Sequence, residues 1–257
     1  MSAKNPNKRS GFAAAAGFAI AVVLCLVLAL TLSSCITIKL NSTKGSGNVI
    51  TRDFEVQDFT RLYFSGIGKL IVQQGETEAL SVEAEENVMD NIRVDVSGNM
   101  LEIGFRGGVF HTIPTRDIIF HLTVKELESI TISGAGNLEC DSLEVQSLEI
   151  NSSGAGNIEL GITADNLEIG ISGAGKVDLS GSVNTQALDI SGAGSYNARD
   201  LESNQCEIDI SGAGRAVVRV NEVLDIRISG LGSVEYYGSP SVTQNVSGVG
   251  GSVKKLD

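Results

Sequence analysis

Serine flanked by glycine is the pattern in this chain that most suggests chemistry. The phrase Ser-Gly-x-Gly occurs seven times in the second half, starting at Ser133, Ser153, Ser172, Ser191, Ser211, Ser229 and Ser247. A nucleophilic serine needs a base within hydrogen-bond reach. The chain has two histidines, and seven equivalent serines cannot share them. We therefore interpret the serines as architectural, with hydroxyl groups that form a ladder along a corner, and we expect no catalytic residue.

Acidic residues recur at fixed distances from these serines and form a first candidate binding face. Glu149 and Glu168 stand four residues before a serine, and Glu139, Glu159 and Asp178 stand six residues after one. In stacked strands such residues lie about 4.8 Å apart, where two charges repel by only about 1 kcal/mol in water. A solvated acidic row therefore needs no ligand. Hard cations favour several carboxylates, so weak calcium binding is a hypothesis here, although we expect no resident metal or cofactor.

A second candidate site lies outside the repeats, in the segment 105–116. His111 stands there between Arg106 and Arg116, and His121 follows closely. Two glycines and a proline indicate a loop. A histidine in a loop is usually only exposed, so these four residues form a site only if the loop brings them together.

The spacing of the serines predicts the elements that position these residues. Successive serines are 20, 19, 19, 20, 18 and 18 residues apart, a period that indicates one small unit stacked repeatedly. Positions one and three before each serine, and five and seven after it, are mostly apolar, with polar residues between them. This alternation indicates strands. Each repeat is predicted as strand, corner, strand and a turn-rich return such as residues 161–166. The fold is therefore an all-β, single-stranded parallel β-helix with coils of about 19 residues.

Glycines of the corner are predicted to serve the backbone. A tight corner needs positive φ or close approach to the next coil, and a side chain obstructs both. Loss of the apolar pattern at Gln244, Ser252 and Lys254 indicates a polar last coil. In the same register Cys140 and Cys206 are about three coils, or ~14 Å, apart, which exceeds the ~7 Å limit for a disulfide.

The first half of the body is less regular. Ser65-Gly66-Ile67-Gly68 is an eighth copy of the phrase, 68 residues before Ser133, so the early coils are irregular or carry insertions. Strand-like alternation covers residues 80–84, 92–96, 101–105 and 118–124, and residues 85–91 favour a helical turn. Residues 36–50 are rich in turn formers and are predicted as a tether.

Export is the simplest interpretation of the N-terminus. Three basic residues precede an uncharged run, residues 12–32, which ends in Leu32-Ser33-Ser34-Cys35. This ending resembles a bacterial lipobox, in which the cysteine is lipidated. We predict that residues 1–35 are a lipoprotein signal and that Cys35 carries the lipid. An uncleaved membrane anchor is the alternative, because 21 apolar residues also span a bilayer.

Either form of attachment places the body outside the cytoplasm, at a membrane. Ile36, which follows the cysteine, is not the aspartate that favours retention at an inner membrane, so we expect the outer membrane or the cell surface. The full chain has a net charge of −12, and loss of residues 1–35 leaves −15. Nucleic acid is therefore excluded as a partner, because phosphate binding needs a basic footprint. A glycan or a matrix protein remains as a partner, besides the membrane.

Several features together resemble the bacterial auto-transporter adhesin family with the head GIN domain. They are the lipobox, the opening Ile50-Thr51-Arg52-Asp53-Phe54, the phrase at Ser65, Gln73-Gln74-Gly75 and the series that begins with Ile130-Thr131-Ile132-Ser133. The resemblance covers residues 51–253 and implies a right-handed parallel β-helix, similar to pectin lyases but without a recognised catalytic set. We therefore expect one β-helix domain over residues 51–257, with regular coils at 130–254.

Adhesion is the role that this resemblance implies. We expect a non-enzymatic envelope or surface lipoprotein that binds a polymer through the lateral face of the β-helix. Two alternatives stay open: a polysaccharide lyase or hydrolase on the same fold, and a passive structural protein of the envelope.

Overall fold

The computed structural model describes residues 43–107 and 112–257. The predicted signal segment with Cys35, and also His111, lie outside these residues. The strands of the first part are β1 (Thr43–Lys44), β2 (Val49–Phe54), β3 (Arg61–Phe64), β4 (Lys69–Gln74), β5 (Ala79–Glu85), β6 (Ile92–Ser97), β7 (Met100–Phe105), β8 (Thr112–Ile113) and β9 (Ile119–Val124), with helix α2 at Glu86–Met89. In the described ranges, no helix combines the length and apolarity needed to cross a membrane.

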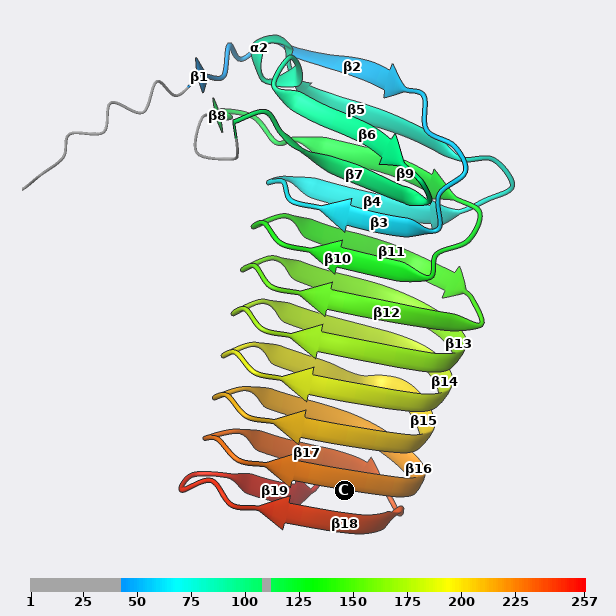
Figure 1. Ribbon diagram of the computed structural model, residues 1–257, viewed down its shortest axis with the longest axis vertical. Helices are drawn as coiled ribbons and strands as arrows, with labels where there is room; N and C mark the ends of the chain where they lie inside the picture. Colours follow the sequence, from blue (N-terminus) through cyan, green and yellow to red (C-terminus); the bar gives the residue numbers. More distant parts are fainter. Residues whose placement is uncertain (1–42, 108–111) are drawn as a thin grey trace, which may run out of the picture. The chain divides into compact units, whose positions relative to one another are not determined.

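The regular coils follow these elements and form a stack (Figure 1). Their strands are β10 (Ser129–Ile132), β11 (Asn137–Glu144), β12 (Ser147–Ser152), β13 (Asn157–Ile171), β14 (Lys176–Ile190), β15 (Ser195–Ile210), β16 (Arg215–Ile228), β17 (Ser233–Gly238), β18 (Ser241–Val246) and β19 (Ser252–Lys255). All pairs between successive coils are parallel, and Ile150, Ile169 and Leu188 stand in register. The predicted β-solenoid and the alignment of its repeats are confirmed.

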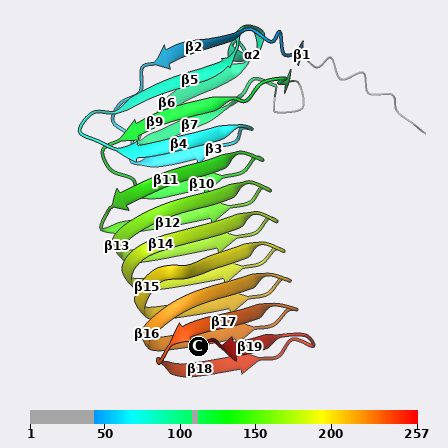
Figure 2. The same ribbon diagram turned by 180° about the vertical axis from the view of Figure 1, so that it is seen from behind.

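Each coil has two outward faces that meet at the Ser-Gly-x-Gly corner. We name the pre-corner face for the strands that lead to the corner: β3, β7, β10, β12, β18 and the second halves of β13–β16. The post-corner face comprises the strands that leave it: β4, β9, β11, β17, β19 and the first halves of β13–β16. Figures 1 and 2 show the two faces from opposite sides.

The turn-rich return predicted at residues 161–166 is wrong. β13 continues through this segment without a break, and Gly161 and Thr163 pair in register with Ser180 and Ser182. No turn is needed, because the backbone groups find their partners in the neighbouring coil while the chain bends. Gly161 instead permits close contact, since a Cβ there would lie 2.0 Å from the carbonyl oxygen of Asp141.

Inward columns of apolar side chains form the core, and one coil places polar groups among them. The Tyr196 hydroxyl is fully buried and donates to Gln186 Oε1 at 2.7 Å. Gln186 Nε2 donates to Ser203 Oγ at 2.7 Å, and Ser203 Oγ donates to the Arg219 carbonyl at 2.9 Å. Because every member has a partner, the network is tolerated in the low dielectric of the core. The two described cysteines, Cys140 and Cys206, are buried and free, and burial raises the pKa of both thiols.

Close approach between coils explains the glycines of the corner. A Cβ on Gly154 would lie 1.9 Å from the Gly134 carbonyl oxygen, which accepts a hydrogen bond from the Ala155 N–H at 3.1 Å. Among the described glycines of the phrase, only Gly68 has positive φ, at 112°. Of the two reasons predicted for these glycines, contact with the next coil is therefore the general one.

Hydroxyl groups of the corner serines do not form the predicted ladder. Within the described residues, no hydrogen bond joins one corner serine to the next, and the serines from Ser153 onward are exposed. Two earlier corner serines have a partner: Ser133 Oγ donates to the Tyr63 hydroxyl at 3.0 Å, and Ser65 Oγ donates to the Ile103 carbonyl oxygen at 3.5 Å. Backbone hydrogen bonds already join successive corners, so the hydroxyls are left to solvent. The residue between the glycines is exposed as well, and Leu231 is 66% exposed.

The eighth phrase, at Ser65, stacks directly on Ser133 although 68 residues separate them. Ala135 donates its N–H to the Gly66 carbonyl at 3.2 Å, and β3 and β4 pair in parallel with β10 and β11. On their other side β3 and β4 pair in parallel with β7 and β9. The predicted insertion is thus the segment between β4 and β10, which folds back on the far side of the β3–β4 coil.

Beyond β7 and β9 the pairing becomes antiparallel, which corrects the expectation of a parallel β-helix throughout. β5 pairs with β9, β2 with β5, and β6 with β7, all antiparallel. Antiparallel strands need only short connections, and Gly98 takes φ of 61° in the connection between β6 and β7. The segments predicted as strands at 80–84, 92–96 and 101–105 are β5, β6 and β7. Together with α2, whose Val88 and Met89 are fully buried, they close this end of the core.

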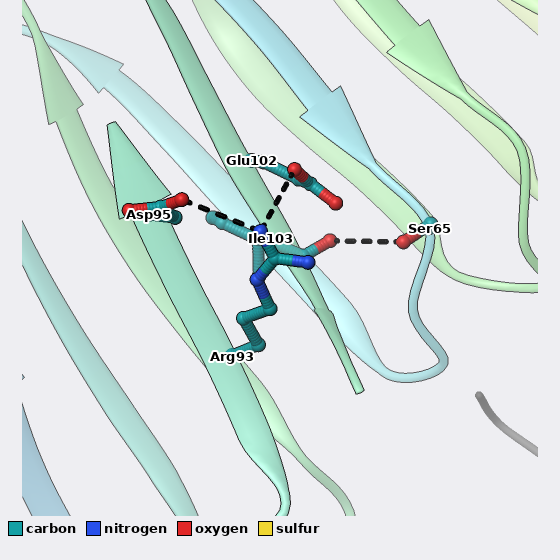
Figure 3. A network of polar contacts seen from close by, with 5 residues as sticks. All are labelled: Ser65, Arg93, Asp95, Glu102 and Ile103. Atoms are coloured by element: carbon teal, nitrogen blue, oxygen red, sulfur yellow. Dashed lines mark hydrogen bonds and ion pairs between the residues drawn. The ribbon is translucent and has the colours of Figure 1, made fainter. Parts of the chain in front are cut away.

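Charged side chains protect the outer strand edge at the closed end. Among the described elements, β6 forms registered pairs only with β7. Arg93 on β6 forms ion pairs with Asp95 at 3.3 Å and with Glu102 at 3.6 Å (Figure 3). Figure 3 also shows the Ser65 hydroxyl, 3.5 Å from the Ile103 carbonyl oxygen. Charges at such an edge oppose pairing with a foreign strand.

The opposite end of the stack is open. Every residue of β18 is exposed, and Val242 and Val246 are 36% and 40% exposed although they continue buried columns. Loss of pattern is confirmed at Gln244, which pairs with Ile226. The same prediction is wrong at Ser252 and Lys254, because the last corner is one residue longer than the others and shifts the alignment by one position. Val253 therefore keeps the apolar column beside Val234, and Lys254 pairs outward with Glu235.

Candidate functional site

The five acids predicted as one candidate face belong to two different faces. Glu149 and Glu168 are paired neighbours on the pre-corner face. Glu139, Glu159 and Asp178 form a continuous row on the post-corner face. A corner separates the two sets in each coil, because one set precedes the serine and the other follows it. The two rows therefore cannot act as a single site.

The pre-corner row is acidic and shallow. It borders a hollow of about 280 Å³ whose floor includes Gly170 and Ala187, and whose acids are Glu149, Glu168, Asp189, Glu207 and Asp209. Arg227 closes one end, with its guanidinium 2.5 Å from Glu207 and 3.0 Å from Asp209. In the described residues, no group of three or more histidines, cysteines or acids stands close enough to hold a metal ion, so the calcium hypothesis gains no support from this row.

The post-corner row carries both signs of charge. Lys69 Nζ lies 2.6 Å from Glu139, and Lys176 Nζ lies 2.8 Å from Asp178. Asn197 Nδ2 donates to the other oxygen of Asp178 at 2.9 Å. Carboxylates, an amide and ammonium groups thus offer donors and acceptors side by side on rigid strands.

Beside this row lies the larger of these two hollows, of about 420 Å³. We name it the post-corner hollow, and it is lined by Glu139, Cys140, Asp141, Glu159, Leu160, Gly161, Lys176, Asp178, Leu179, Ser180, Asn197 and Asp200. Gly161 and Ser180 stand eight residues after their serines, and the absence of a side chain at Gly161 and the small one at Ser180 leave the space open. The lining is mainly polar, which suits a hydroxyl-rich ligand more than an apolar one.

Sequence reasoning missed a cationic and aromatic cluster that lies close to the same position of the repeat. Counting eight residues after each serine gives Asp141, Gly161, Ser180, Arg199, Arg219 and Tyr237. The guanidinium carbons of Arg199 and Arg219 lie 5.5 and 5.1 Å from the centroid of the Tyr237 ring, within the range of cation–π attraction. The change from small residues to arginine and tyrosine was visible in the aligned repeats, but only if this outward position had been counted.

The predicted loop site is not assembled by the described residues. His121 lies on β9, with Nε2 3.3 Å from Glu83 Oε1. Arg106 follows β7, and Arg116 precedes β9. Among the described residues no hydrogen bond or ion pair joins Arg106, Arg116 and His121. A role for His111 remains a prediction, because that residue lies outside the described ranges.

Glu85 is a buried carboxylate that sequence reasoning also missed. It is 1% exposed and accepts hydrogen bonds from the Thr115 hydroxyl at 2.5 Å, the Gly47 N–H at 2.6 Å and the Thr115 N–H at 2.7 Å. The Thr115 hydroxyl contributes most to lowering the pKa of Glu85, from 4.5 to about 2. Its partners follow β1 and β8, two strands that pair with each other but lie far apart in sequence, so we interpret it as a latch rather than as an acid catalyst. Its position at the end of β5 gave no signal in the sequence.

Fold and surface together define a β-solenoid protein with a polar lateral hollow and a closed N-terminal end. The family model "Putative auto-transporter adhesin, head GIN domain" matches residues 58–240, and the chain belongs to this family. No curated protein matches the chain.

Several solved structures of bacterial proteins have the same fold. A putative adhesin from Bacteroides fragilis is 26% identical, with a TM-score of 0.79, and covers 84% of this chain and 100% of its own. A putative lipid binding protein from Parabacteroides distasonis is 24% identical with a TM-score of 0.70, and a putative adhesin from Parabacteroides merdae is 22% identical with a TM-score of 0.66. Each of the latter two also covers 84% of this chain and 100% of its own, and they establish the fold alone.

Proposed function

We propose that this protein is a non-enzymatic lipoprotein of the cell envelope that binds a glycan polymer through its post-corner face. The observation that supports this most is the post-corner hollow, in which Glu159, Asp178 and Asn197 repeat from coil to coil beside Lys176. Strands about 4.8 Å apart present these groups as a periodic row. Carboxylates accept hydrogen bonds from hydroxyls, whereas the ammonium and amide groups donate to ring and hydroxyl oxygens.

The post-corner face is a better candidate than the pre-corner face because its charges are mixed. Five acids border the pre-corner hollow, and Arg227 already pairs with two of them. Charged hydrogen bonds discriminate strongly when both donors and acceptors are offered. An adhesive role agrees with the name of the family, although fold alone does not establish function.

A matched pair of variants on one strand tests the proposed face. Asp178→Asn lies in the post-corner row of β14, and Asp189→Asn removes the same charge from the pre-corner face of β14. The full chain would be screened on an array of neutral and acidic glycans, and binding to each hit would be measured for both variants. We expect Asp178→Asn, combined with Glu159→Gln, to weaken binding at least tenfold, and Asp189→Asn to leave it unchanged. Equal loss in both variants, or no glycan hit at all, would contradict the proposal.

Enzymatic activity is tested by a separate readout. Each polysaccharide that binds would be incubated with the purified chain, and new reducing ends and unsaturated products would be measured. We expect neither to increase over time. Turnover that disappears in the Asp178→Asn variant would replace the binding role by a lyase or hydrolase.

The same proposal includes attachment to a membrane through lipid on Cys35. It also includes a location at the outer membrane or cell surface. The coils are proposed to wind in a right-handed sense. The lipid rests on the sequence Leu32-Ser33-Ser34-Cys35, and one lipoprotein cysteine carries enough acyl chain for stable anchoring. Metabolic labelling with an alkyne fatty acid should mark the wild-type chain and not Cys35→Ser. Labelling of both chains, or of neither, would contradict lipidation at this residue.

A further inference from the structure

Two arginines of the regular coils differ from every other basic residue between Ser129 and Val246. Lys176, Arg215 and Arg227 each form an ion pair with a carboxylate, at 2.8, 2.6 and 2.5 Å. Arg199 and Arg219 form none among the described residues, although Asp200 directly follows Arg199 and Glu202 pairs in register with Arg219. In a chain with 31 acidic residues against 19 basic ones, two adjacent cations without a carboxylate partner are unexpected.

Tyr237 holds these two arginines without neutralising them. Both guanidinium groups lie within cation–π distance of its ring, and Arg219 Nε donates to the Arg199 carbonyl at 2.9 Å. The ring attracts cations through its quadrupole and carries no net charge. The cluster therefore keeps two positive charges and the remaining guanidinium N–H donors, which match the geometry of a carboxylate or a sulfate.

The position of the cluster relates it to the post-corner hollow. Arg199 directly precedes Asp200, which lines the hollow, and Arg219 pairs with Tyr237 in the next coil. The register shifts after Asp178, so Ser180 pairs with Asp200, and Arg199 lies at this shift beside the hollow. A polymer that leaves the small-residue floor at Gly161 and Ser180 past Asp200 therefore meets the two arginines. Hydroxyl contacts and an anionic contact are thus arranged in succession along the stack.

We propose that the Arg199–Tyr237–Arg219 cluster binds the anionic group, a carboxylate or a sulfate, of an acidic glycan whose neutral hydroxyls occupy the post-corner hollow. This inference rests on the proposed function and specifies its ligand. A densely charged polymer is disfavoured, because the acids of the hollow and the net charge of −12 repel it. The glycan selected is one with sparse negative charge, in which acidic sugars alternate with neutral ones.

Hyaluronan, which alternates a uronate with a neutral sugar, is a suitable probe, and its carboxyl-reduced derivative is the neutral control. The full chain in detergent would be tested with both polymers and with chondroitin sulfate, which adds sulfate groups. We expect at least tenfold tighter binding of hyaluronan than of the reduced polymer, and a fall of this preference with rising salt. If sulfate is the better anion, chondroitin sulfate should exceed the reduced polymer in binding by a larger factor than hyaluronan does.

Charge-matched variants show which residues cause the preference for hyaluronan over the reduced polymer. Arg199→Gln combined with Arg219→Gln should abolish it, whereas Arg227→Gln, on the pre-corner face, should retain it. Tyr237→Leu should weaken it, because the arginines lose their common platform. Melting curves for each variant identify any that fail to fold, and replacement of both arginines by lysine should restore part of the preference.

The outcomes separate this inference from the proposed function. If the double variant keeps the preference, or Arg227→Gln loses it equally, the cluster is not the anion site. If neutral and acidic polymers bind equally, the inference fails and the proposed function stands. Binding that depends on both arginines but occurs only to phosphatidylglycerol vesicles would assign the anion to a lipid headgroup and overturn the glycan. Absence of binding to every polymer would overturn both.

Discussion

At the scale of single residues, Glu85 shows how one buried carboxylate can join distant segments. Its oxygens accept N–H and hydroxyl groups from Gly47 and Thr115, which lie on either side of it in sequence. A Cβ on Gly45 would lie 1.9 Å from Glu85 Oε2, so that glycine is required for the latch to close. The ionised form is favoured, since all these partners are donors.

Stability should depend on the ionisation of Glu85. Its pKa is lowered from 4.5 to about 2, so its contribution is fully present above pH 4.5 and is lost as the pH falls toward 2. Glu85→Gln should lower the melting temperature at pH 7, and this difference from wild type should shrink across that acidic window. Thermal melts between pH 2 and 7 measure both effects. Glu86→Gln, at the exposed neighbour, is the control, and a pH-independent difference for Glu85→Gln would contradict the latch.

The buried Tyr196 provides a second test at this scale. Tyr196→Phe removes the donor to Gln186 Oε1 and leaves a buried acceptor without its partner. An unsatisfied buried group costs about 1–3 kcal/mol. Chemical denaturation should show this loss for Tyr196→Phe and little change for Tyr236→Phe, whose hydroxyl has no partner in the described structure. Equal stability of the two variants would mean that the network contributes nothing.

At the scale of elements, the corner combines a position that excludes a side chain with one that accepts any. A Cβ on Gly173 would lie 2.1 Å from the Gly154 carbonyl oxygen, whereas the next residue, Ala174, is exposed. Leu231 occupies the position equivalent to Ala174 and is 66% exposed. Neighbouring residues in one phrase are therefore constrained by different contacts.

Substitutions at these two positions should have opposite results. Gly173→Ala forces the coils apart and should destabilise the protein by roughly 1–3 kcal/mol or more. Ala174→Leu, a much larger change, should stay within about 0.5 kcal/mol of wild type because its side chain enters solvent. Denaturant melts compare the two variants directly. A tolerated Gly173→Ala would show that the coils can separate without cost.

Elements in the repeats could be predicted because seven aligned copies display the same alternation. The columns at Ile150 and Ile158 follow from period-two patterning, and the exposed acids follow from the same register. The return at residues 161–166 could not be predicted, because glycine there serves contact between coils while its sequence resembles a turn. The antiparallel end could not be predicted either. The first half contains a single copy of the phrase, at Ser65, and the copy that stacks on it lies 68 residues later. Arg199 and Arg219 can be recognised as a cluster only when the structure places Tyr237 beside them.

At the scale of the whole molecule, the two ends of the solenoid differ in burial. α2 and the antiparallel strands cover the core at one end, whereas β18 leaves Val242 and Val246 partly exposed at the other. Local unfolding is easiest where few apolar contacts hold an element. The stack is therefore not equally stable along its length.

Amide hydrogen exchange should follow this asymmetry. We expect the fastest exchange in β18 and β19 and the slowest in β13–β15, which have a paired coil on each side. Exchange followed by mass spectrometry resolves these segments. A single exchange rate throughout the stack would instead indicate that all coils unfold together.

The coil formed by β3 and β4 also determines the order in which the solenoid can be built. Every strand of the closed end has been synthesised by Val124, before the first regular strand begins at Ser129. A chain made from its N-terminus can thus complete this template first. Each later coil then meets one finished edge at a time, in the order of synthesis. The repeats are similar to one another and could otherwise pair with the wrong neighbour. The order in which they are synthesised therefore determines which coils pair.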